Sequence, residues 1–262
     1  MQPLDVNLPI LFTELDLLER PAAAKAAGFD AVEFWWPFPV AVPSDSEVDA
    51  FVRAVEQAGV SLVGLNFFAG NMPAGERGVL SHPARAGEFA DNVDVAVGIG
   101  DRLGCRAFNA LYGNRIEGAD PAAQDEVAVA SLVRAAKATA RIGGTVLVEP
   151  VSGVPEYPLK TADDAVAVID RVHREGVDNL RLLFDLYHLT VNGDDLDLAL
   201  DRHADVIGHV QIADAPGRHE PGTGEIDFGH YLGKLRAVGY HGHIGLEYKP
   251  TGHSADSFGW IN

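Results

Sequence analysis

The chain has 262 residues, 47% of them hydrophobic, and its 38 acidic against 20 basic residues give a formal charge of −18 at pH 7. This length suits one α/β barrel domain, and the negative charge disfavours nucleic acid or an anionic membrane surface as a partner. No apolar run is long enough to span a membrane, and the start lacks the basic and apolar segments of a signal peptide. We therefore expect a cytoplasmic protein, in which the single cysteine, Cys105, is a packed thiol without a disulfide partner.

One unit recurs along the chain: a helical pattern, a glycine, then a short apolar strand that ends on a polar residue. Glycine suits the left-handed residue that closes a helix, and the following five to nine residues fit a short loop and a buried parallel strand. The glycines and strand ends are Gly28 and Glu33, Gly59 and Asn66, Gly104 and Asn109, Gly143 and Glu149, Gly176 and Asp185, and Gly239 and Glu247. Helix starts are predicted by capping boxes at Ser44 and Thr161, and by Asp120 before a proline.

The strand ends recur about every 36 residues, as expected for βα units. A first strand over residues 7–12 and a seventh over 207–212, which lacks the preceding glycine, bring the predicted number of units to eight. Because no glycine-rich turn follows the first strand, the pattern favours a closed (β/α)8 TIM barrel over an open nucleotide-binding sheet. We expect a single domain over residues 1–262, with a short last helix over 254–260 or an irregular tail.

Four strand ends carry residues able to bind a hard cation or move a proton. They are Glu149, Asp185, Gln211 and Glu247, on the fifth to eighth strands. Because parallel barrel strands all end at one face, we expect these side chains to share half of the barrel mouth. Three carboxylates held together raise one another's pKa unless a cation compensates, and an all-oxygen set suits Mg²⁺ or Mn²⁺ better than zinc. The alternative, that each caps a helix or pairs with an arginine, explains four consecutive strands less well.

Other residues near the predicted mouth are candidates for substrate contact. His188 follows Asp185 where the strand turns into its loop, and we expect it to bind a carbonyl oxygen or relay a proton. Arg218 and Lys249 would attract an anionic substrate, although surface salt bridges are an equally common use of such residues. Asn66 is a candidate hydrogen-bond donor at the end of the third strand.

Two further features surround this site. His209 lies two residues before Gln211 on the same side of its strand, so we expect it to orient Gln211 or a glutamate. Long βα loops are expected over 69–83 and 214–224, and the second lacks a nucleotide-phosphate motif. A group of aromatic residues is expected to wall a small pocket: Phe12, Trp35, Trp36, Phe67 and Phe68.

The chain resembles the hydroxypyruvate isomerase family within the xylose-isomerase-like barrels. The likeness covers nearly the whole chain and is carried by residues 11–14 (LFTE), 27–34 (AGFDAVEF), 74–78 (AGERG), 184–188 (FDLYH), 208–214 (GHVQIAD) and 217–226 (GRHEPGTGEI). The resemblance implies that Glu149 and Glu247 move protons and that these two glutamates, with Asp185 and Gln211, ring a divalent metal. Related ketose epimerases tend to carry histidine at the position of Gln211, which favours an isomerase here. The family usually continues its fifth strand as Glu-Pro-Ile-Asn, whereas this chain has Ser152 in place of the asparagine.

The leading hypothesis is therefore an aldose-ketose isomerase that converts hydroxypyruvate to tartronate semialdehyde (2-hydroxy-3-oxopropanoate) in glyoxylate metabolism, by metal-assisted proton transfer through an enediolate. Alternatives on the same barrel are a 2-oxo-tetronate isomerase, a ketose 3-epimerase, a sugar dehydratase and a non-catalytic sugar-acid binding protein. An abasic-site nuclease would need a histidine-rich cluster and a basic groove, which the sequence does not indicate. The expected partner is a small hydroxy-oxo acid, and the sequence leaves a homo-oligomer open.

Overall fold

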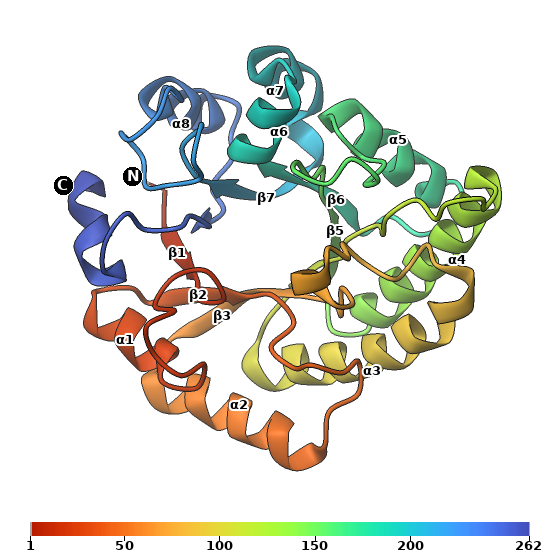
Figure 1. Ribbon diagram of the computed structural model, residues 1–262, viewed down its shortest axis with the longest axis horizontal. Helices are drawn as coiled ribbons and strands as arrows, with labels where there is room; N and C mark the ends of the chain where they lie inside the picture. The colour runs from red at the N-terminus through yellow and green to blue at the C-terminus, as the bar shows by residue number, and fades with distance from the viewer. Residues whose placement is uncertain (1, 262) are drawn as a thin grey trace.

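Eight parallel strands form a closed barrel that the helices surround on the outside (Figure 1). The computed structural model describes residues 2–261. The strands are β1 (Leu4–Asn7), β2 (Ala31–Phe34), β3 (Ser61–Asn66), β4 (Ala107–Asn109), β5 (Thr145–Val148), β6 (Leu180–Asp185), β7 (Ile207–Ile212) and β8 (Ile244–Leu246). Each strand pairs in parallel with the next, and β8 pairs with β1. The predicted TIM barrel is confirmed.

Three helices begin where the sequence signals place them, and six end one to three residues before a predicted glycine. The helices are α1 (Arg20–Ala26), α2 (Asp45–Ala58), α3 (Ala86–Leu103), α4 (Pro121–Ala140), α5 (Ala162–His173), α6 (Leu186–Asn192), α7 (Leu196–His203) and α8 (Phe228–Ala237), with 3₁₀ turns η1 (Met72–Ala74), η2 (Pro83–Arg85), η3 (Ala204–Val206) and η4 (Ser254–Ile261). Both capping boxes, at Ser44 and Thr161, are present, and Asp120 caps α4. The predicted short last helix is the 3₁₀ segment η4.

The first strand is the element that the sequence misplaces. We predicted residues 7–12, but β1 spans Leu4–Asn7. Pro9 has no N–H with which to continue the ladder, and the N–H of Leu11 turns back to the carbonyl of Asn7 at 3.0 Å. Residues 8–12 therefore form a turn above the barrel.

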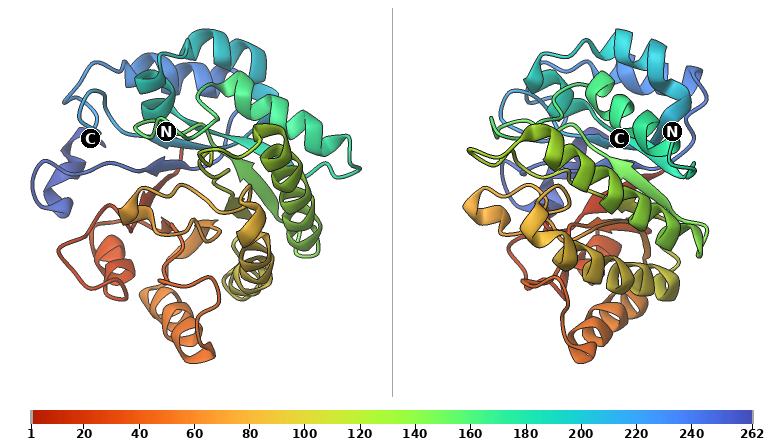
Figure 2. Two further views of the ribbon diagram at one scale, coloured as in Figure 1. Left: turned by 45° about the vertical axis from the view of Figure 1, so that its right-hand side comes forward. Right: turned by 90° about the vertical axis from the view of Figure 1, so that its right-hand side faces the viewer.

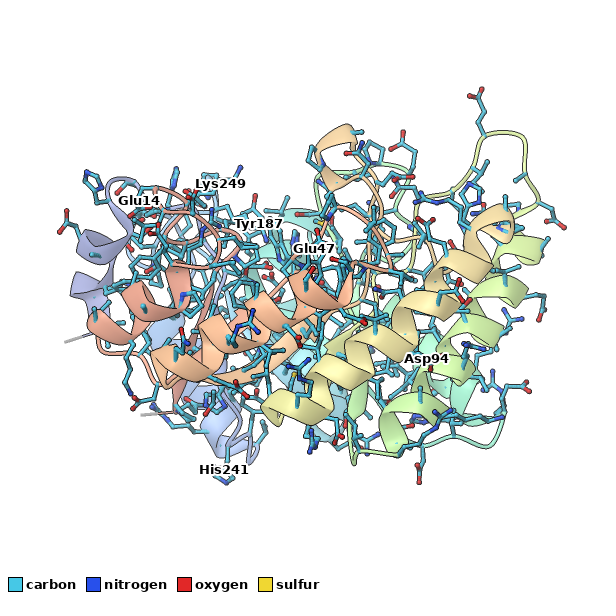
Figure 3. All side chains as sticks on the ribbon, turned by 90° about the horizontal axis from the view of Figure 1, so that it is seen from below. Glu14, Glu47, Asp94, Tyr187, His241 and Lys249 are labelled. Carbon is cyan, nitrogen blue, oxygen red and sulfur yellow. The ribbon has the colours of Figure 1, made fainter. Side chains whose placement is uncertain are left out.

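The carboxyl ends of the strands mark the functional end of the barrel. Figure 3 shows Tyr187 and Lys249, which follow β6 and β8, at one end together with Glu14, and His241, which precedes β8, at the opposite end. In the right-hand view of Figure 2 the loop with η1 projects from one end of the barrel. In barrels of this class, active sites lie at the carboxyl ends of the strands.

No helix among residues 2–261 has the length and apolar character needed to cross a membrane.

Cys105 is buried in the core, and we expect it to be chemically inert in the native protein. The side chain has no exposed surface, and burial raises the pKa of its thiol to about 12. The thiolate is the reactive form, so at pH 8 native Cys105 should resist iodoacetamide, while in urea its pKa returns to about 8.5 and alkylation proceeds. Mass spectrometry after timed labelling measures both rates. Equal rates in native and unfolded protein would contradict the packed-thiol assignment.

Candidate active site

A cavity of about 650 Å³ opens at the carboxyl ends of the strands. Residues that follow all eight strands contribute to its wall: Pro9, Ile10, Thr13, Glu14, Trp35, Asn66, Met72, Pro73, Arg77, Leu111, Glu149, Val151, Ser152, His188, Arg218, Glu247, Lys249, Pro250 and Gly252. Six of the candidate residues from the sequence are among them. The other two, Asp185 and Gln211, are only 1% and 3% exposed and do not line this cavity.

An acidic cluster lies at this end of the barrel. Glu149, Asp185, His188 and Glu247 are all buried, and each offers an oxygen or nitrogen atom within 4.8 Å of those of the others. Burial, followed by the charges of Glu247 and Asp185, raises the pKa of Glu149 well above its usual value. Burial, followed by Glu247, likewise raises the pKa of Asp185 to about 7. The cluster is thus electrostatically strained until positive charge or protons neutralise it.

Glu149 and Asp185 are each held through one carboxylate oxygen. Oε2 of Glu149 accepts a 2.6 Å hydrogen bond from Nδ2 of Asn109, which ends β4. Oδ1 of Asp185 caps α6 by accepting from the N–H groups of Tyr187 (2.7 Å) and His188 (3.1 Å). The second oxygen of each carboxylate accepts no hydrogen bond from the described residues, so it is available to a ligand.

Glu247 is held through both of its oxygens. Oε1 accepts from Nε1 of Trp35 at 2.6 Å and from Nδ2 of Asn7 at 3.1 Å. Oε2 contacts Nη2 of Arg218, whose guanidinium also lies 5.3 Å from the ring centre of Tyr187. Burial raises the pKa of Glu247, and Arg218 opposes this rise without cancelling it. Arg218 therefore neutralises part of the acidic cluster.

His188 is held in one tautomer by the loop after β5. The N–H of Ser152 donates to Nδ1 of His188 at 3.0 Å, so Nδ1 must be unprotonated. Burial, with the nearby charges of Arg218 and Arg77, holds the pKa of His188 well below its usual value. The ring is consequently neutral, with its hydrogen on Nε2. That N–H lies 3.8 Å from oxygens of both Glu149 and Asp185 and can donate, but cannot bind a metal without losing its hydrogen.

Gln211 is oriented by a glutamate from the far side of the barrel. Nε2 of Gln211 donates to Oε1 of Glu33 at 2.6 Å, and the same oxygen accepts from Nδ2 of Asn7 at 2.9 Å. This bond sets the direction of the amide and leaves Oε1 of Gln211 as a buried acceptor without a partner among residues 2–261. Glu33 thereby orients Gln211 and is also linked to Glu247 of the acidic cluster through the Asn7 bridge.

Glu33 lies in a polar layer inside the barrel. His209 Nε2 lies 2.8 Å from Oε2 of Glu33, which confirms that His209 orients a glutamate. Burial opposes charge on His209, but the carboxylates of Glu33 and Asp5 outweigh it and raise the His209 pKa to about 9. The layer has space for the Glu33 carboxylate because its neighbours are glycines: a Cβ at Gly245 would lie 2.8 Å from Oε1, and a Cβ at Gly64 would lie 3.2 Å from Oε2.

The donor set fits a hard divalent cation. Glu149 and Asp185 each have one oxygen free of hydrogen bonds, and Oε1 of Gln211 is buried and unpartnered. A buried amide oxygen without a partner is costly unless something binds it. Carboxylate and amide oxygens are the ligands that such cations prefer.

Several residues of the site were not assigned a function from the sequence. Asn109 and Glu33 end strands in the same repeat that revealed Glu149, so the strand-end rule could have included them. Asn7 ends β1, but the sequence placed that strand over residues 7–12, and Arg77 lies on a loop that gives no such signal. Of the five aromatic residues predicted to wall the pocket, Trp35 lines the cavity and the other four do not. Those four are Phe12, Phe67 and Phe68, which are buried in the core, and Trp36, whose Nε1 donates to the carbonyl of Val40.

Comparisons with known proteins agree with this architecture. The family model described as "Xylose isomerase-like TIM barrel" matches residues 21–262. A Streptomyces coelicolor protein named provisionally as a hydroxypyruvate isomerase is 53% identical over 99% of this chain and 95% of that protein. The 2-oxo-tetronate isomerase of Cupriavidus necator is 34% identical over 97% and 95%. A crystal structure titled as an AP endonuclease, family 2, from Brucella melitensis has a TM-score of 0.90 and 35% identity, and the match covers 100% of this chain and 98% of that one. The chain therefore belongs to the hydroxypyruvate isomerase family of the xylose isomerase-like TIM barrels.

Proposed function

We propose that the protein is an aldose-ketose isomerase of small hydroxy-oxo acids, and that it converts hydroxypyruvate to tartronate semialdehyde. The observation that carries this proposal is the pair Glu149 and Glu247, two buried carboxylates that directly follow β5 and β8 and line one cavity. Isomerisation removes a proton from one carbon and returns one to its neighbour, so it needs two acid-base groups in one site. Glu247 helps to raise the pKa of Glu149, as expected of a pair tuned for proton transfer.

In hydroxypyruvate, a proton leaves C3 and one returns to C2, while the hydroxyl hydrogen passes from O3 to O2. We assign the first transfer to Glu149, because its Oε1 is free of hydrogen bonds from the described residues, and the second to Glu247. Neutral His188 would donate its Nε2 hydrogen to the oxygen on which negative charge develops in the enediolate. Each of these groups lines the cavity.

We propose that Glu149, Asp185, Gln211 and Glu247 hold Mg²⁺ or Mn²⁺. The ion would stabilise negative charge on the substrate oxygens during proton transfer. His188 is left out of this set because its Nε2 carries the hydrogen, and the unpartnered Oε1 of Gln211 takes its place. An all-oxygen set of this kind is suited to hard cations rather than zinc.

A second candidate substrate is 2-oxo-tetronate, which has one more carbon. Ser152, the shorter residue where the family usually has asparagine, lines the cavity beside His188 and leaves additional room there. The 34% identical relative that carries this activity in its name favours the same alternative. An abasic-site nuclease is not favoured, because His188 is the only histidine among the described residues that line the cavity.

A substrate panel in D₂O tests the proposal. The purified protein with Mg²⁺ or Mn²⁺ is incubated with hydroxypyruvate, 2-oxo-tetronate and common ketoses, and the products are followed by NMR. We expect hydroxypyruvate to give the isomeric aldehyde acid and 2-oxo-tetronate to give its 3-oxo isomer, each with deuterium at the new C–H position. Excess chelator should reduce the rate to less than a tenth, and returning the metal should restore it.

Other products would assign other functions. Loss of water would identify a dehydratase, and inversion of a ketose at C3 without acid turnover would identify an epimerase. Binding of the acids without solvent exchange at carbon would identify a non-catalytic binding protein. Any of these three results would overturn the isomerase proposal.

A further inference from the structure

Arg77 is a half-buried cation of the cavity that has no carboxylate partner within residues 2–261. It belongs to the loop between β3 and α3 and lines the cavity. Arg218, the other arginine there, contacts Glu247, and Lys249 is exposed. Since the chain carries a net charge of −18, an anionic substrate needs local positive charge that acidic groups have not already neutralised.

The guanidinium of Arg77 is fixed along one edge by its own loop. Nη1 donates to the carbonyl oxygens of Met72 at 3.0 Å and Glu76 at 2.7 Å. Neither Nε nor Nη2 of Arg77 donates to any acceptor in the described part of the chain. These two nitrogens form the fork that binds a carboxylate through two parallel hydrogen bonds.

The backbone around Arg77 is pinned to the neighbouring loop after β4. The carbonyl of Arg77 accepts from the N–H of Gly113 at 2.8 Å, and the N–H of Gly78 donates to the carbonyl of Ala69 at 2.9 Å. Gly78 has a φ of 102°, and a Cβ there would lie 1.9 Å from the carbonyl oxygen of Leu111. This close approach requires glycine and holds Arg77 in place before any ligand binds.

Arg77 lines the same cavity as Glu149, His188 and Arg218. Burial and then Arg218 lower the pKa of Arg77, while Glu149 raises it. The charges of Arg218 and Arg77 both lower the pKa of His188. The cavity therefore has a cationic part next to its acidic cluster, as a substrate with an anionic group beside its reacting carbons requires.

We propose that Arg77 is the residue that binds the C1 carboxylate of the substrate and so restricts the enzyme to hydroxy-oxo acids rather than neutral sugars. This rests on the proposed isomerase function. In this arrangement the fork of Arg77 holds the carboxylate, and the carbonyl and hydroxyl carbons face Glu149 and Glu247. Arg77 thereby determines substrate specificity without taking part in proton transfer.

Hydroxypyruvate and dihydroxyacetone test this role, because they differ only in a carboxylate replaced by a hydroxymethyl group. In Arg77→Gln we expect kcat/KM for hydroxypyruvate to fall about 100-fold, the loss expected for two charge-assisted hydrogen bonds, and that for dihydroxyacetone to change less than about threefold. Arg77→Lys, which keeps the charge but not the fork, should lose about tenfold. Arg102→Gln, which removes a surface cation paired with Asp49, is the control and should match the wild type.

Binding of glycerate, an unreactive hydroxy acid, gives a readout that does not depend on turnover. Calorimetry should show that Arg77→Gln weakens it about 100-fold. Equal losses for hydroxypyruvate and dihydroxyacetone would reveal a structural role and overturn the proposal, as would a selective loss in Lys249→Gln but not in Arg77→Gln. Failure of the isomerase function is recognised separately, because the wild type would then convert neither hydroxy-oxo acid while glycerate binding still reports on Arg77.

Discussion

Glu149→Gln is expected to lower kcat for hydroxypyruvate by about 10³-fold, because an amide cannot accept the proton from carbon. The substitution preserves the shape of the site. The amide oxygen can still accept the hydrogen bond from Asn109 that Oε2 accepts in the wild type. Binding of the substrate should therefore change much less than turnover, and the loss should appear in kcat rather than KM.

Glu247→Gln is expected to lose turnover to a similar extent, with an added structural effect. Its amide oxygen can accept from Trp35 and Asn7, but its NH₂ group must then face the guanidinium of Arg218, where the wild type has a carboxylate oxygen. Two donors cannot bond to each other. Glu149→Gln is consequently the cleaner test of proton transfer, and Glu247→Gln should also show weaker substrate binding.

The measurement is solvent exchange as well as turnover. In D₂O, both variants should lose deuterium incorporation at carbon in parallel with product formation. Glu14→Gln is the matched control, since Glu14 is an exposed carboxylate at the rim that accepts hydrogen bonds from Ser254. A Glu149→Gln variant that keeps more than a tenth of the wild-type kcat would remove Glu149 from the chemistry.

The location of the acidic cluster could be predicted from the sequence because the topology of a barrel largely determines which residues meet. Once strands alternate with helices, every strand end lies at one face, and residues 36 or more positions apart, such as Glu149 and Asp185, must approach each other. Glycines before six of the strands and the capping boxes mark most element boundaries locally. β7 lacks such a glycine, but its apolar run IGHVQI still predicts its bounds to the residue, whereas β1, whose apolar run continues through Pro9, is misplaced.

What the sequence could not predict are contacts that depend on side-chain direction across the barrel. The bond from Gln211 to Glu33 joins residues 178 positions apart, and nothing near either residue indicates it. Arg77 lies in an irregular loop where periodicity carries no information, so its fork became visible only with the backbone that holds it. The strand ends in the sequence thus predict which side chains lie together at the barrel mouth. The three-dimensional structure is needed to see which of their atoms are free to bind a ligand.

Glu33→Leu is expected to weaken metal binding and to lower turnover, each by about 100-fold, although Glu33 is not a proposed ligand. Loss of a residue that orients a metal ligand typically costs 10–100-fold in affinity or activity. Without the Glu33 acceptor, the amide of Gln211 is free to rotate and to present Nε2 in place of Oε1. The Asn7 bridge to Glu247 loses one of its two acceptors at the same time.

Two further variants separate this positioning effect from simple loss of stability. Glu33→Gln can still accept from Gln211 through its amide oxygen, and should recover most of the metal affinity. His209→Leu breaks the same buried pair with Glu33 but leaves the acceptor of Gln211 in place, so it should lower the melting temperature as Glu33→Leu does while weakening metal binding far less. Breaking a buried pair costs about 3–5 kcal/mol, which makes this control essential.

Titration calorimetry of the metal-free variants with Mn²⁺ provides the readout, since it reports on ligand geometry without substrate. The expected order of affinity is wild type, Glu33→Gln, His209→Leu and, well below these, Glu33→Leu. If Glu33→Leu and His209→Leu lose metal affinity equally, the effect comes from the stability of the barrel interior and Glu33 has no specific part in orienting Gln211. The expected order would instead show that Glu33 of β2 sets the orientation of the Gln211 amide without being one of the proposed metal ligands.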